Sequence, residues 1–147
     1  MPVSNLYESD FFAWANEQAG LLRSGRLGVA DIEHIAEEIE SMGRTEKREL
    51  VSRLAVLLLH LLKWQYQPAR RGSSWRRTIL EQRIRLASHL ADNLSLRTRS
   101  AESVAEAYRL AVIGAVDETG HEEQTFPTIC PWVFERIMDA EFWPDQD

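Results

Sequence analysis

The chain has 147 residues, of which 44% are hydrophobic and 27% charged, and a formal net charge of −6 at pH 7. This size and balance are typical of one folded domain and exclude a disordered or fibrous protein. The single cysteine, Cys130, excludes an intramolecular disulfide and suits a reducing compartment. The longest apolar run, Leu54 to Leu62, is too short to span a bilayer, which needs about 20 residues, and Met1 to Glu8 show no signal peptide. We therefore expect a cytoplasmic protein that does not enter a membrane.

Helical periodicity dominates the chain, and strand-like alternation is almost absent. Ser9 is a candidate N-cap of a first helix, which Gly25 ends. Asp31 is the candidate cap of a second helix, which ends at Gly43. The apolar stripe of this second helix consists of Ile32, Ile35, Ala36, Ile39 and Met42.

The third helix begins at Thr45 and runs to about Tyr66, because Pro68 stops it. Its leucines cover most of its sides, which is typical of a helix surrounded by others. The further predicted helices are a fourth over 75–94, a fifth over 100–119 and a short one over 132–140. The fold class is therefore all-α, a single domain over residues 1–147 with about five main helices in an up-and-down bundle plus a short C-terminal helix.

Two stretches carry a resemblance to a known family. The first is Glu37-Glu38-Ile39-Glu40-Ser41-Met42-Gly43-Arg44, and the second is His60-Leu61-Leu62-Lys63-Trp64-Gln65-Tyr66-Gln67-Pro68, continued by Ser74-Trp75-Arg76 and Glu81-Gln82-Arg83. With these stretches the chain resembles domain-of-unknown-function family 29, a helical family of bacterial proteins, over nearly its whole length. The resemblance implies a bacterial helical domain and brings no catalytic residues with it.

Charge is unevenly distributed along the chain. Residues 1–50 carry 5 basic and 10 acidic side chains. Residues 51–100 carry 10 basic and 2 acidic side chains, and residues 101–147 carry 2 basic and 11 acidic side chains. Arginines next to aromatic side chains can follow phosphates and stack on bases, so the basic middle segment is a candidate anion or nucleic-acid surface. Its members are Arg70, Arg71, Arg77 and Trp75. The alternative is that the basic helix packs against acidic ones, and the pI of about 5.3 favours this alternative.

Arg76 and Arg83 fall within the apolar face of the fourth helix. A guanidinium on such a face needs a carboxylate partner or a water-filled pocket, because an unpaired buried charge is costly. The candidate partners in a buried Arg/Glu network are the carboxylates of the second helix, Glu33, Glu37 and Glu40. An anion-binding or enzymatic pocket between the second and fourth helices is the alternative.

Metal and nucleophile signatures are weak. His34-x-x-x-Glu38 and Glu118-x-x-His121 have ligand-compatible spacing, but a di-metal carboxylate bundle needs a second Glu-x-x-His. The chain contains no nucleophile elbow, no phosphate-binding glycine loop and no Cys-x-x-Cys pair. We therefore expect no cofactor, no metal and no catalytic residue.

Surplus apolar side chains form the last candidate surface. They lie opposite the apolar stripe of the fifth helix and in the C-terminal segment, and comprise Leu110, Ile113, Phe134, Phe142 and Trp143. Such residues either close the end of the bundle or form an interface. The preferred interpretation is a non-catalytic helical interaction domain, whose partner is another protein or a second copy of the chain.

Overall fold

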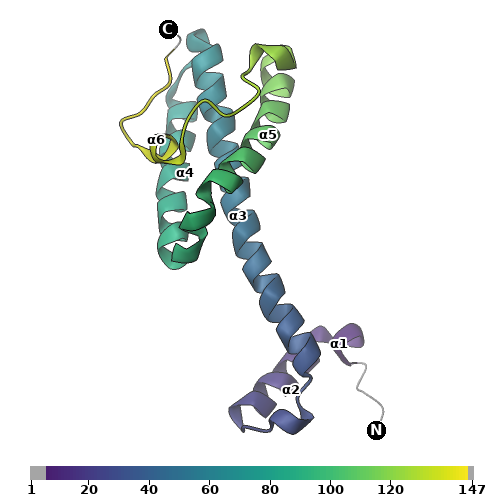
Figure 1. Cartoon of the computed structure of the whole chain (residues 1–147). Helices are drawn as coiled ribbons and strands as arrows, with labels where there is room; N and C mark the ends of the chain where they lie inside the picture. Colours follow the sequence, from purple (N-terminus) through teal and green to yellow (C-terminus); the bar gives the residue numbers. More distant parts are fainter. Residues whose placement is uncertain (1–5, 146–147) are drawn as a thin grey trace. The chain divides into compact units, whose positions relative to one another are not determined.

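The computed structural model describes residues 6–145, which form six α-helices and no strand (Figure 1). The all-α class is confirmed. Residues 1–5 lie outside the described residues. They belong to the stretch from which the absence of a signal peptide was predicted. The chain divides into two compact units, the N-terminal unit Met1–Thr45 and the C-terminal unit Glu46–Asp147. No described helix is both long enough and apolar enough to cross a membrane.

The N-terminal unit contains α1 (Leu6–Ser9), α2 (Phe11–Arg23) and the first part of α3 (Ile32–Tyr66). The cap of α2 is Asp10, one residue after the predicted Ser9, and its carboxylate accepts a hydrogen bond from the backbone N of Ala13 at 3.1 Å. Gly25 follows the helix with φ 72°, the left-handed conformation that favours glycine after a helix end.

The two short helices contact α3 mainly through polar and aromatic groups. The indole N of Trp14 donates to Asp31 at 3.1 Å, and the backbone N of Asp31 donates to Gln18 at 2.7 Å. The ring of Tyr7 stacks on His34 with centroids 3.9 Å apart, and its hydroxyl donates to Glu38. The short helices therefore cover Asp31, the residue before α3, and the side of α3 that carries His34 and Glu38.

The predicted apolar stripe exists, but it faces solvent. Ile32 is 53% exposed, Ile39 63% and Met42 66%, and only Ile35 is partly covered. At 100° per residue the stripe lies beside the covered polar side rather than on it. The N-terminal unit therefore buries little apolar surface of α3.

Helix α3 continues without a break from Ile32 to Tyr66, so the predicted end at Gly43 and new start at Thr45 were wrong. Glycine inside a helix costs only about 1 kcal/mol relative to alanine, which neighbouring turns of a long helix can offset. Thr45 caps nothing, because its hydroxyl donates to the backbone O of Ser41 within the helix, at 3.0 Å.

The C-terminal unit is a three-helix bundle covered by the final segment. The rest of α3 lies beside α4 (Ser73–Asp92) and α5 (Ser100–Thr119), and the chain then returns across them (Figure 1). Its core is centred on the leucines predicted to be surrounded, with no exposed surface at Leu50, Leu54, Leu57, Leu58, Leu61 and Leu62. The short helix α6 (Phe134–Met138) is shorter than the predicted 132–140, because Val133 is still extended.

Candidate functional site

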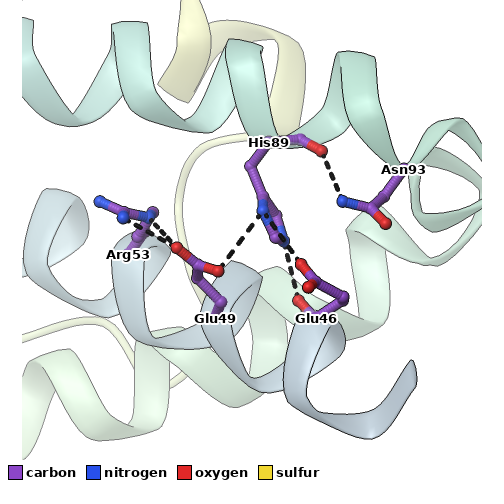
Figure 2. A network of polar contacts seen from close by, with 5 residues as sticks. All are labelled: Glu46, Glu49, Arg53, His89 and Asn93. Carbon is purple, nitrogen blue, oxygen red and sulfur yellow. Dashed lines mark hydrogen bonds and ion pairs between the residues drawn. The ribbon is translucent and has the colours of Figure 1, made fainter. Parts of the chain in front are cut away.

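A histidine of α4 and two glutamates of α3 form a polar cluster in the C-terminal unit, which we call the Glu46–His89 cluster. Glu46 and Glu49 are three residues apart, so they share one face of α3, and His89 lies in the last turn of α4. Figure 2 shows the imidazole of His89 pointing toward both carboxylates. His89 is only 9% exposed, whereas the two glutamates are partly open to solvent.

The hydrogen bond of the ring defines its chemistry. Nε2 of His89 lies 2.8 Å from the backbone O of Glu46, and a carbonyl only accepts, so Nε2 carries a hydrogen. Nδ1 then holds the lone pair of the neutral ring. It lies 3.6 Å from Oε2 of Glu46 and 3.7 Å from Oε2 of Glu49, without a hydrogen-bond partner in the described structure. A lone pair facing two carboxylates is repulsive, so the arrangement calls for a cation between them, either a proton or a metal ion.

Neighbouring side chains hold the cluster in place. Arg53 donates twice to Oε1 of Glu49, from Nε at 3.0 Å and from Nη2 at 2.8 Å. This hydrogen bond lowers the pKa of Glu49 from its ordinary value. Asn93 donates to the backbone O of His89 at 3.0 Å (Figure 2). The cluster opens into a surface cleft of about 470 Å³ that Arg85, Ser88 and Asp92 also line.

Sequence reasoning missed this cluster. The Glu46-x-x-Glu49 spacing was a local signal, but the histidine comes from another helix and only the packing of α3 on α4 brings it there. The two pairs whose spacing is compatible with metal ligands, and at which no metal was expected, have other contacts. His34 contacts Asp31 at 2.7 Å, and Glu118 lies 3.4 Å from the amine of Lys63.

The buried Arg/Glu network was wrong in its partners. Arg83 is 4% exposed as expected, but its Nε donates to the backbone O of Ile137 and its Nη2 to that of Phe142, both at 2.8 Å. Nη1 has no partner among the described residues, and burial lowers the pKa of the guanidinium. For Arg76 the predicted burial was wrong as well, because its side chain is exposed above the ring of Trp143, 4.9 Å from the ring centroid.

The three glutamates assigned to that network face solvent. Glu33, Glu37 and Glu40 are all exposed, and Glu40 lies 3.9 Å from Arg44 on the next turn of its own helix. Because backbone carbonyls accept hydrogen bonds from a guanidinium as carboxylates do, Arg83 is buried without an acidic partner.

The arginine-rich segment is divided between two roles. Arg71 donates to the backbone O of Trp64 at 2.6 Å and to that of Pro144 at 3.3 Å, and so ties the final segment to α3. Arg70 and Arg77 are exposed, and Trp75 is half-buried beneath the amine of Lys63. The structure therefore removes Arg71 from the surface set, and nucleic-acid binding by the others stays a prediction.

The predicted interface residues also separate into two groups. Phe134, Phe142 and Trp143 are partly buried against the core, so the C-terminal aromatics close the bundle. Leu110 and Ile113 on α5 remain exposed. They and the stripe of α3 are among the large apolar side chains that the fold leaves exposed.

The family model described as Domain of unknown function DUF29 matches residues 6–143. The chain belongs to the DUF29 family. This confirms the resemblance on the two quoted stretches, and no specific function comes with it. No curated protein and no solved structure matches the DUF29 chain.

Proposed function

We propose that this DUF29 protein is a non-catalytic helical interaction domain, and that the exposed stripe of α3 binds an amphipathic helix with basic flanks from a partner protein. The observation that carries the proposal is the exposure of Ile32, Ile39 and Met42, each more than half open to solvent. Exposed apolar side chains that adjoin one another on one helix face are typical of a binding surface.

The spacing of the stripe suits a helical partner. Ile32, Ile35, Ile39 and Met42 are separated by three, four and three residues, the heptad spacing of a helix–helix seam. Two residues on this face of the helix are small. Ala36 is exposed, and nothing lies within 4 Å of the position where Gly43 would carry a Cβ. A second helix could therefore approach closely.

The charge around the stripe selects the partner. Residues 6–45 carry 8 acidic and 3 basic side chains, and exposed Glu33, Glu37 and Glu40 line one side of the stripe. Two copies joined through this face would bring like charges together, whereas lysines and arginines along a partner helix would complement it. The charge thus favours a basic partner over a second copy.

The proposal also includes the cellular compartment in which the protein works. We infer that the protein works in the bacterial cytoplasm, where its single thiol stays reduced. Cys130 is half-buried, and burial raises the pKa of its thiol, which disfavours a reactive thiolate.

A designed peptide tests the binding surface. The probe is a helix of about 18 residues, made of leucine and lysine with a heptad apolar stripe, and the comparison is a scrambled peptide of the same composition. Fluorescence anisotropy should show that the patterned peptide binds more tightly and weakens with added salt. The double variant Ile39→Asp, Met42→Asp should weaken binding at least about tenfold. The matched control is Ile84→Asp, which changes a 71% exposed isoleucine on α4 and should leave affinity unchanged.

Two outcomes would overturn the proposal. Equal affinity for the patterned and scrambled peptides, or an equal loss with Ile84→Asp, would show that the stripe recognises no helix. Native mass spectrometry addresses the second copy. A dimer that Ile39→Asp dissociates would make another copy of the chain the occupant instead of a basic helix.

A further inference from the structure

We propose that the Glu46–His89 cluster is a site for one divalent transition-metal cation such as Zn²⁺, held by Oε2 of Glu46, Oε2 of Glu49 and Nδ1 of His89. The three side chains offer one ligand atom each, and these atoms all lie within 4.8 Å of one another. The three residues are not among those of the proposed partner surface, and this proposal does not rest on that one.

The distances fit a small cation. Zinc binds imidazole nitrogen and carboxylate oxygen at about 2.0–2.2 Å, so ligand atoms around a tetrahedral ion are about 3.3 Å apart. Nδ1 of His89 lies 3.6 and 3.7 Å from the two carboxylate oxygens. Both glutamates are 40% or more exposed at the side chain, so a small rotation of each closes the remaining gap.

The hydrogen bonds around the proposed ligands resemble those that orient ligands in metal sites. A ligating histidine usually donates its other ring N–H to a backbone carbonyl or a carboxylate, and Nε2 of His89 donates to the backbone O of Glu46. Arg53 holds Oε1 of Glu49 and leaves Oε2 directed at the histidine. These contacts orient the side chains of His89 and Glu49 before a cation binds.

The ligand set indicates the class of cation. One imidazole nitrogen with two carboxylate oxygens suits zinc, manganese, iron or cobalt, whereas copper(I) prefers thiolates and magnesium an all-oxygen shell. Three protein ligands leave a fourth position, which water from the adjoining cleft would fill.

Metal titration of the full chain tests the site. After chelator treatment, isothermal titration with zinc chloride should give one equivalent bound, and cobalt(II) should develop the visible absorption of a tetrahedral site. Glu49→Gln should weaken zinc binding at least about tenfold while far-ultraviolet circular dichroism shows an unchanged fold. His89→Gln should weaken it similarly. The matched control is His34→Gln, which alters another histidine next to a carboxylate, and it should bind zinc like the unmodified chain.

The controls separate this site from adventitious binding. An equal loss of affinity in His34→Gln, or unchanged affinity in Glu49→Gln, would overturn the assignment. Absence of zinc binding to the unmodified chain would also overturn it and would leave the cluster as contacts between side chains alone.

Discussion

Replacement of Arg83 by alanine should release the C-terminal segment from the bundle. The side chain is 4% exposed and donates to the backbone O of Ile137 and of Phe142, which belong to the part of the chain that closes the core. Its guanidinium also lies 5.5 Å from the ring centroid of Trp143. One side chain therefore joins α4 to α6 and to the residues that follow it.

The expected cost follows from these contacts. A buried acceptor left without its donor costs about 1–3 kcal/mol. The hydrogen bond to Ile137 is buried and the one to Phe142 is partly buried. Lost contact with the aromatic ring adds about 0.5–1 kcal/mol. We expect Arg83→Ala to lower the free energy of unfolding by about 3–5 kcal/mol, and Arg83→Met, which keeps the aliphatic stem, to lower it by less.

Urea unfolding followed by circular dichroism measures this loss, and hydrogen exchange locates it. Amides of residues 134–143 should exchange faster in Arg83→Ala before those of α3 do, because the lost bonds hold that segment. The matched control is Arg85→Ala, whose exposed ion pair with Glu81 spans 3.8 Å and should contribute within about 0.5 kcal/mol. A loss below about 1 kcal/mol in Arg83→Ala, with unchanged exchange over 134–143, would refute the reasoning.

Further predictions concern the N-terminal unit and the helix ends. The hydrogen bond that His34 donates to the carboxylate of Asp31 raises the pKa of His34. This pair therefore stabilises the unit below the ordinary histidine pKa of 6.5 and stops doing so as the pH rises through the raised value. NMR titration of the ring should show this, and Asp31→Asn should return the pKa toward 6.5. Gly43→Ala should stabilise the chain by about 0.5–1 kcal/mol in thermal unfolding, because the position is helical and open. Gly120→Ala should destabilise it by about 1 kcal/mol, because φ is 74° there, and equal effects of the two substitutions would contradict the conformational argument.

Local signals predicted most of the secondary structure. Gly25 and Gly120 each stand where a helix ends with positive φ, and the predicted fifth helix over 100–119 coincides with α5. These features depend on the conformational preferences of residues next to one another, which the sequence contains directly. The leucines of α3 were predicted to be surrounded because they cover several sides of one helix, and this too is local information.

The error at Gly43 shows where such signals fail. A glycine followed by a candidate cap resembles a helix end, but the cost of one glycine is small beside the hydrogen bonds of a 35-residue helix. The exposed stripe of α3 shows a second limit. Periodicity revealed the stripe, and only the docking of α1 and α2 on the neighbouring polar side decided that it would stay open.

The sequence by itself determined the helical class and most helix boundaries, because both depend on residues close together in the chain. The tertiary structure alone decided what Arg83 bonds to and that His89 meets Glu46 and Glu49. Those contacts join residues that are far apart in the chain. The contacts of Arg83 are to backbone carbonyls, which every residue carries. Side-chain type therefore could not reveal the partners, and only the packing of the helices brought them within reach.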